Sequence, residues 1–463
     1  MNRILMIGTA MLLAVHLAPA APVPEATETV IRLEVTPMAA PVPALKYQLL
    51  PHLREIQQGN SVQNFMKCFM EQNHFFFNKE EVEKRAKYET MPLQDLPAKD
   101  LRGYGGIALR QADYAARMES TDWQILPLLR RDGFRTLLPE IQQMRQLASA
   151  LKVRLRVEIA EKKFDEAIRT TATLFSLARV IGEHPTVIAE LVGIAVCHLT
   201  IPPLEEMINQ PGCPNLYWAL STLPEPMIDL RRGAQAERVG VESELSFLTD
   251  KRPMSAEEVQ KGLEKLQELF QMMQIGPPPI QKLDPILKTQ ADDKKKMDAA
   301  KQRLASSGLT PKLIEQFHPY QVILLDEKLR YDILLDDLTK YLVQPYWVFE
   351  AQVGQIDQRI KSAGGIASSF MPSFNKIRQA QARLQQRLAM LRVVEALRLH
   401  AAENGSLPEK LDDIAVPVPV DPVNGKPFLY SLESGKATLK GAAPKGMEIN
   451  STFNIRYQIS LKK

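Results

Sequence analysis

The sequence predicts a mainly α-helical protein: a TPR-like array of helical hairpins followed by a small C-terminal α+β module, with one long helix and a short antiparallel sheet. Three observations predict this. Apolar residues recur every three or four positions through most of the chain, which is the period of a helix with one buried face. Aromatic residues make up only 6% of the sequence, and good helix formers such as Leu, Ala, Glu, Lys and Arg are abundant. Runs of β-forming residues lie near the two ends.

Residues 1–20 have the three parts of a secretory signal peptide. Asn2-Arg3 is a short basic start, Ile4–Leu17 is apolar, and Ala18-Pro19-Ala20 places small residues before the cleavage point. Pro19 ends the apolar run before it reaches the roughly 20 residues of a membrane-spanning helix. We therefore predict cleavage after Ala20 and a secreted or periplasmic protein.

The mature chain has a nearly balanced charge. The signal peptide holds one of the 58 basic residues and none of the 54 acidic ones, which leaves a net charge of +3. Such a balance gives no general attraction to nucleic acid. The most apolar later stretch, Val187–Ile201, contains Glu190 and His198, so we predict no integral membrane segment after cleavage and expect protein partners instead.

The three cysteines leave two alternatives. Cys68 and Cys197 lie in helical apolar stripes and Cys213 lies in a proline-rich turn. An exported protein can hold one disulfide, whereas buried free thiols behave as small apolar side chains. Because the spacing does not choose between them, both alternatives stay open.

Turn residues and composition divide the mature chain into four parts. Residues 21–46 form an extended proline-rich arm with one β-type run, Thr29–Val35. Residues 47–250 form the helical-hairpin domain and residues 251–372 a second helical block. Residues 373–463 form the C-terminal helix and small sheet.

Local patterns predict several helix boundaries. Glu161-Lys162-Lys163 joins two periodic segments into an αα-hairpin. Pro185 opens the next helix, which Pro202-Pro203 is expected to kink or divide. Ser255 and Glu258 have the spacing of a capping box, and Asp292–Lys296 is expected to be a solvated helix start rather than a basic patch.

The clearest helix is Phe374–Glu403. One face is apolar and the other is basic; the basic residues are Arg378, Arg383, Arg387, Arg392 and Arg398. The basic face could rest on anionic lipid or lie in water, and we expect water. Asn404-Gly405 ends the helix, and three strand-like runs follow: Phe428–Ser431, Ala437–Lys440 and Thr452–Ser460.

The C-terminal module carries a family resemblance. Ala396–Pro408, followed by Leu411, Ile414 and the segment Asp421–Tyr430, resembles the globular module of type II secretion major pseudopilins over about 40 residues. The shared pattern is a helix, a glycine stop, a proline-led turn and a strand entry of the form DPxxGxP. The chain lacks that family's adjoining N-terminal apolar helix, and Lys436–Lys445 is basic where the family has an acidic calcium-binding loop.

More of the mature chain is similar to a family of uncharacterised secreted planctomycete proteins. The similar segments are 43–47, 122–123, 164–168, 211–223 and 319–325. This resemblance implies export and a helical architecture, and it implies no activity. The segment 164–168 also resembles part of a tetratricopeptide repeat, although no second copy follows at a 34-residue period.

No catalytic motif stands out. The chain has no HExxH, GxSxG, GxxxxGK[ST] or suitably placed GxGxxG. None of the six histidines after the signal peptide has another histidine three or four positions away; they are His52, His74, His184, His198, His318 and His400. His184 and His318 precede prolines at helix starts, where we expect a turn role. We predict no catalytic, cofactor-binding or metal-binding residue.

Two groups of residues offer weaker candidates. The helix at 319–343 holds Asp326, Glu327, Asp332, Asp336 and Asp337, of which Asp332 and Asp336 share a face. Such a pair could perform acid–base chemistry on an envelope glycan, but the interleaved basic residues favour a salt-bridged exposed face. Trp218 and the pairs Asp122-Trp123 and Tyr346-Trp347 are expected in the core rather than in a sugar- or peptide-binding platform.

The sequence therefore predicts a secreted, non-catalytic helical interaction or scaffold protein of the cell envelope. Stacked helical hairpins present long binding surfaces without a reaction centre. Two alternatives stay open: an envelope-polymer hydrolase that uses carboxylates, and an accessory component of a type II secretion or pilus-like machine.

Overall fold

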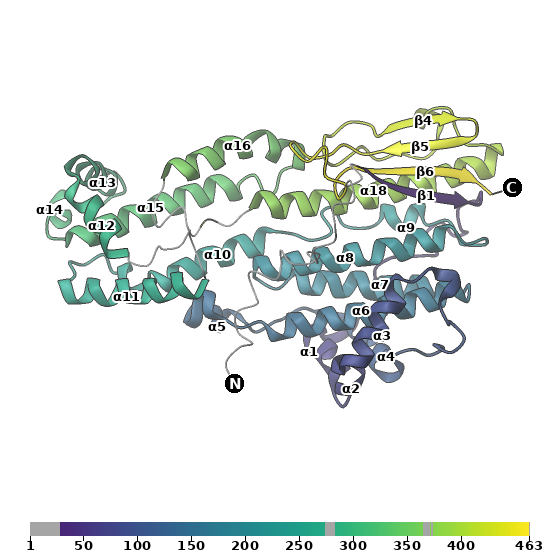
Figure 1. The fold of residues 1–463 in the computed structure, drawn as a ribbon, viewed down its shortest axis with the longest axis horizontal. Helices are drawn as coiled ribbons and strands as arrows, with labels where there is room; N and C mark the ends of the chain where they lie inside the picture. Colours follow the sequence, from purple (N-terminus) through teal and green to yellow (C-terminus); the bar gives the residue numbers. More distant parts are fainter. Residues whose placement is uncertain (1–27, 274–282, 364–370, 372–373, 463) are drawn as a thin grey trace, which may run out of the picture.

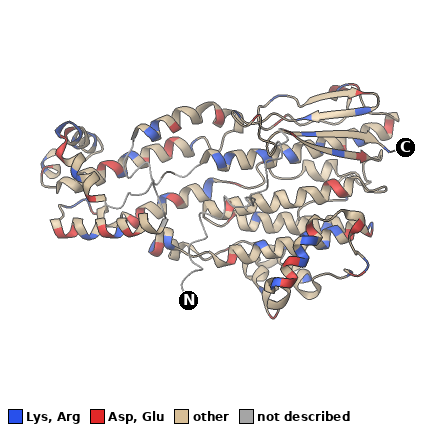
Figure 2. Ribbon diagram, in the orientation of Figure 1, with Lys and Arg blue, Asp and Glu red and all other residues tan. Residues whose placement is uncertain are grey.

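The computed structural model describes residues 28–273, 283–363, 371 and 374–462. It is mainly helical with a small four-stranded sheet. Long helices run side by side along an elongated body, with the sheet at one end and α11–α14 at the other (Figure 1). The predicted signal peptide lies outside the described residues. Basic and acidic residues are interspersed along the helices (Figure 2).

The N-terminal part consists of short elements. They are 3-10 turns at Leu53–Glu55, Lys67–Phe69, Leu93–Asp95 and Gly133–Arg135, strands β2 (Gln57–Asn60) and β3 (Met118–Ser120), and helices α1 (Ser61–Met66), α2 (Asn73–Phe77), α3 (Lys79–Thr90), α4 (Gly106–Ala115) and α5 (Leu126–Asp132). β2 and β3 pair in parallel.

The predicted αα-hairpin is confirmed. It is formed by α6 (Pro139–Ala160) and α7 (Phe164–Gly182). Lys162 closes the turn with a left-handed φ of 56°. The next helix, α8, covers Val187–Ile208. The expected division at Pro202-Pro203 is wrong, since α8 continues through both prolines; α7 and α18 pack on it and hold the helical backbone despite the missing N–H groups.

α8 contains the apolar stretch for which the sequence predicts no membrane segment. Its 22 residues are long and apolar enough to cross a membrane by length and composition, and 67% of its most apolar window is buried inside the protein. In this structure α8 is a core helix, packed against α6, α7, α10 and α18.

The part of the chain from α9 to α16 has the two helix starts that the sequence predicts for α11 and α13. Its helices are α9 (Tyr217–Ser221), α10 (Arg231–Glu244), α11 (Ala256–Met273), α12 (Leu283–Asp292), α13 (Lys294–Ser306), α14 (Pro311–Ile314), α15 (Pro319–Thr339) and α16 (Tyr346–Ala363), with a 3-10 turn at Ser246–Leu248. The capping box is confirmed: the Glu258 carboxylate accepts from the Ser255 N–H at 2.8 Å, and Ser255 Oγ accepts from the Glu258 N–H at 3.2 Å. Asp293 caps α13, as its sequence indicated.

The long helix α18 (Phe374–Asn404) is confirmed, but the expectation for its basic face is wrong. Arg398 is 0% exposed and Arg378 is 3% exposed. Arg387 binds the carboxylate of Glu205 on α8, and Arg383 lies over the ring of Phe453. α8, the N-terminal arm and the sheet cover most of this face, whereas Arg392 stays partly exposed.

The sheet has the order β1–β6–β5–β4, formed by β1 (Thr29–Val35), β4 (Leu429–Glu433), β5 (Lys436–Lys440) and β6 (Ile455–Leu461). A 3-10 turn at Leu411–Asp413 precedes it. β4, β5 and β6 are antiparallel, as predicted. The sheet is nevertheless mixed, because β1 from the N-terminal arm pairs with β6 in parallel.

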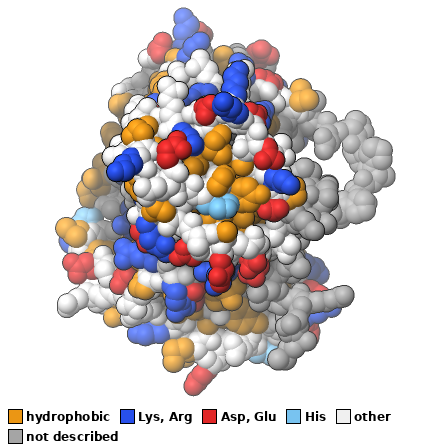
Figure 3. All heavy atoms as spheres, turned by 90° about the vertical axis from the view of Figure 1, so that its left-hand side faces the viewer, with side chains coloured by type: hydrophobic (Ala, Val, Ile, Leu, Met, Phe, Trp, Pro, Cys, Tyr) orange, Lys and Arg blue, Asp and Glu red, His pale blue; other side chains and the backbone are white. Residues whose placement is uncertain are grey.

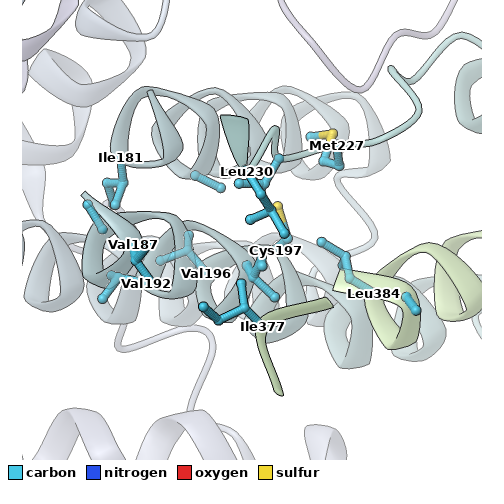
Figure 4. Packing of buried hydrophobic residues seen from close by; sticks show 14 of the residues in the cluster. Ile181, Val187, Val192, Val196, Cys197, Met227, Leu230, Ile377 and Leu384 are labelled. Atoms are coloured by element: carbon cyan, nitrogen blue, oxygen red, sulfur yellow. The ribbon is translucent and has the colours of Figure 1, made fainter. Parts of the chain in front are cut away.

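Apolar side chains from distant parts of the chain meet in the core. Ile181 from α7, Val192 and Val196 from α8, Leu230 before α10 and Ile377 from α18 lie close together (Figure 4). The three cysteines are buried free thiols, which decides the alternative that the sequence left open. Burial raises the pKa of Cys68 and of Cys213 to about 12.

Candidate functional site

The carboxylates of α15 are held in ion pairs. Lys328 Nζ lies 2.8 Å from Asp332, Arg238 of α10 binds Asp336, and Lys340 Nζ lies 2.7 Å from Asp337. The predicted salt-bridged face is therefore confirmed for these acids. Asp326 and Glu327 differ, since each is only 2% exposed; the Asp326 oxygens accept from Arg303 at 2.6 and 2.8 Å.

Two hollows lie along α10. The first has a volume of about 460 Å³ and is walled by the end of α7, the loop 225–229 and the start of α10. The second has a volume of about 670 Å³ and is walled by α10, the end of α15 and the segment 340–343. Arg231 lines both hollows, and we call the two together the α10 groove.

The α10 groove carries charges of both signs. Arg231 is paired with Asp229 at its first end, with Nε 2.7 Å from Oδ2. The Arg238–Asp336 pair lies in the second hollow. Arg232 donates to the backbone carbonyl of Glu183 at 3.2 Å. The groove thus gathers polar groups from three helices and presents paired charges instead of an isolated acid and base.

A buried carboxyl of α8 lies against the start of α10, and its only sign in the sequence is an acidic residue within an apolar run. Glu190 is 0% exposed, and its Oε1 accepts from the Gly233 N–H at 2.6 Å, which caps α10 from α8. Its Oε2 has no hydrogen-bond partner in the described part of the chain. Burial raises the pKa of Glu190 to about 9. A side chain at Gly233 would collide with this carboxyl, because its Cβ would lie 2.3 Å from Oε2.

The pKa values of two further carboxyls are also raised. Burial raises the pKa of Glu237, on α10, to about 7, and that of Glu158, on α6, to about 7. The hydroxyl of Tyr331, on α15, is buried without a hydrogen-bond partner among the described residues. None of these three residues lines either hollow, so we assign them to the interior and not to the groove.

The two proline-preceding histidines have the predicted turn role. His318 Nδ1 accepts from the Tyr320 N–H at 3.2 Å and caps α15. His184 Nδ1 lies 2.9 Å from Thr186 Oγ1, and burial lowers the pKa of His184 to about 4. Over the ranges that the structure describes, no group of three His, Cys, Asp or Glu residues could hold a metal ion.

The aromatic candidates divide between core and surface. Trp123 packs against the core, and its Nε1 donates to the carbonyl of Val180 at 2.9 Å. Tyr346 is 3% exposed. Trp218 is only partly buried, and the fully buried anchor beside it is Tyr217. Trp347 departs from the core expectation, because it is 37% exposed and lies against Gly425.

The end of the molecule at α11–α14 offers a different surface. Hydrophobic side chains gather at its centre and charged side chains surround them (Figure 3). The apolar residues of this region that are partly exposed pack against the core; they include Met297, Leu309, Leu313 and Tyr320. The apolar side chains at this end therefore cover the core. We take the α10 groove as the candidate site instead.

The DPxxGxP segment has a clear structural role. Asp421 is 1% exposed, and its carboxylate accepts from Gln386 Nε2 of α18 at 2.9 and 3.0 Å, from the Val423 N–H at 2.9 Å and from the Ala442 N–H at 2.6 Å. One buried carboxylate thus ties the strand entry to α18 and to the end of β5.

Replacing Asp421 with alanine is expected to lower the free energy of unfolding by about 3 kcal/mol, because it leaves buried donors without an acceptor. Urea denaturation measures the loss, and faster hydrogen exchange at Val423 and Ala442 localises it. Asp412→Ala, at an exposed position in the preceding 3-10 turn Leu411–Asp413, is the control and should change stability by less than about 0.5 kcal/mol. Equal stability of the two variants would contradict this role.

Comparison with protein-family models, with curated proteins and with solved structures finds no match for this chain.

Proposed function

We propose that this chain is a secreted, non-catalytic helical interaction or scaffold protein of the cell envelope, and that it binds a protein partner in the α10 groove. The observation that carries the proposal is the groove itself: two adjoining hollows along one helix, walled by three helices and two loops. Its paired guanidinium and carboxylate groups suit a polypeptide segment that has charged side chains of both signs.

The paired state of the acids supports a binding role over a hydrolytic one. A hydrolase of the type considered above needs one carboxyl to give a proton and a second to act as base or nucleophile. Asp332 and Asp336 are each held by a basic side chain. The α6–α7 hairpin is consistent with a TPR-like scaffold, and the helix and sheet of residues 374–462 keep the pseudopilin-like alternative of a secretion component open.

A photo-crosslinking residue placed at Gln235 tests the proposal. Gln235 is exposed and lines the second hollow, and Gln302, exposed on α13, is the matched control position. In cells that export the protein, we expect one discrete adduct from position 235 and none from position 302. Arg231→Glu, which reverses the charge shared by both hollows, should reduce the adduct at least fivefold without changing the helical circular dichroism.

Three results would contradict the proposal. The first is the absence of an adduct from position 235, and the second is an adduct that Arg231→Glu leaves unchanged. The third is hydrolysis of an envelope polymer by the purified protein that Asp332→Asn and Asp336→Asn abolish. Export is checked separately, by N-terminal sequencing of the mature protein, which should begin at Ala21.

A further inference from the structure

The two edges of the four-stranded sheet differ. At the β1 edge, the Glu34 N–H donates to Asn209 Oδ1 at the end of α8, at 2.8 Å, so part of that edge is already bound within the chain. At the other edge, β4 lies on the rim of the molecule, with the long helices on the far side of the sheet (Figure 1). In the sheet of the described residues, β4 therefore has a strand neighbour on one side only.

The hairpin geometry shows which groups this open edge presents. β4 and β5 are joined by Ser434-Gly435, whose φ values of 49° and 75° form a two-residue hairpin turn. The residues that flank such a turn bond to each other, and bonded and non-bonded positions then alternate along the strand. The N–H and C=O groups of Tyr430 and Leu432 therefore point away from β5. Neither residue has a backbone hydrogen-bond partner on that side within the described ranges.

β4 also lacks the features that usually protect an edge strand. It contains no proline, no lysine and no bulge. Leu429 is 68% exposed at its start. Pro427, just before the strand, prevents the edge from extending further. The outward N–H and C=O groups of two residues in this five-residue strand, Tyr430 and Leu432, are thus left unpaired at the rim.

We propose that β4 is a dimerisation edge, on which β4 of a second copy of this chain pairs antiparallel about a two-fold axis at Ser431. In this register Tyr430 lies opposite Leu432 of the second copy, and these pairs exchange all the outward N–H and C=O groups. Leu429 lies opposite Glu433 of the second copy. An axis at Tyr430 would place Pro427 opposite the strand. An axis at Leu432 would place the turn residue Ser434 opposite it.

The side chains of β4 favour a second copy as the occupant. Tyr430 and Leu432, both partly buried on the helix side of the sheet, meet their counterparts as two apolar pairs across the axis. Glu433 faces Leu429 and not another Glu433, so like charges do not meet. A symmetric pair of this kind is isologous and closes after two copies. This dimer goes beyond the proposed function, because it does not use the α10 groove.

Sedimentation equilibrium of the purified chain tests the dimer. We expect a reversible monomer–dimer equilibrium with a dissociation constant below about 1 mM. Leu429→Glu places carboxylates opposite Glu433 in a non-hydrogen-bonded pair, where side chains approach most closely, and should weaken dimerisation at least tenfold. Leu429→Lys should leave it equal or stronger, and Leu429→Glu combined with Glu433→Lys should restore it.

Arg32→Glu on the β1 edge, at an exposed position, is the control and should not change the dimer constant. Circular dichroism confirms that each variant is folded. A protein that stays monomeric up to about 1 mM would overturn the proposal, and so would a dimer that responds equally to Leu429→Glu and Leu429→Lys. Binding of an extended peptide from another protein at β4, with the chain itself monomeric, would overturn it as well.

Discussion

Replacing Arg398 with methionine is expected to lower the free energy of unfolding by roughly 3–5 kcal/mol. Arg398 and Glu395 form an ion pair at 2.9 Å in which both side chains are 0% exposed. Arg398 also donates to the backbone carbonyls of Thr36 and Cys213, at 3.0 and 2.7 Å. The substitution leaves a buried carboxyl and these carbonyls without their donor. Chemical denaturation followed by circular dichroism measures the loss.

Two further variants identify the cause of that loss. Lys376→Met, at an exposed position on α18, removes a cation without uncovering a buried partner and should change stability by less than about 0.5 kcal/mol. Glu395→Leu combined with Arg398→Met removes both charges and should be more stable than Arg398→Met alone. A double variant that is no more stable than the single one would show that the pair is not the source of the effect.

Replacing Glu190 with glutamine is expected to remove a large pH dependence of stability. Burial raises the pKa of Glu190 from 4.5 in the unfolded chain to about 9 in the folded protein. Between these values the folded protein keeps a proton that the unfolded chain has released. The stabilisation is therefore complete below pH 4.5 and is lost as the pH rises toward 9, by up to about 1.4 kcal/mol per pH unit.

Urea denaturation of both proteins from pH 5 to pH 8.5 measures this effect. The free energy of unfolding of Glu190→Gln relative to the natural protein should rise with pH across the range. Glu237 and Glu158 titrate in both proteins, so the difference isolates Glu190. Glu242→Gln, at an exposed position of α10, is the control, and its free energy of unfolding should change with pH as that of the natural protein does. If the free energy of unfolding of Glu190→Gln also followed the natural protein across the pH range, Glu190 would not be the source of the pH dependence.

The sequence predicted those features that depend on nearby residues. The Ser255–Glu258 capping box, the turn at Lys162 and the helix from Phe374 each arise from interactions within a few positions. The same holds for the strand Thr29–Val35, because its own β-forming residues predict a strand and do not tell which strand pairs with it. The pairing of that strand with β6 leaves no local mark, because it joins opposite ends of the chain.

The error over the arginines of α18 has a related cause. Helical periodicity identifies an apolar face, but it does not tell whether water or a second layer of protein covers the polar face. Arg387 is paired with Glu205, which lies in a segment that resembles an ordinary apolar helix. The sequence does not predict the α10 groove for the same reason, because the walls of the groove come from segments about 100 residues apart.

The parallel pairing of β1 with β6 has a consequence for how the protein matures. Thr29 and Ser451, which are bonded beside this pair, are 422 positions apart. β6, one of the two central strands of the sheet, is thus synthesised long after its partner β1. Until β6 is available, β1 has no strand to pair with among the described residues, so this part of the sheet forms late in folding.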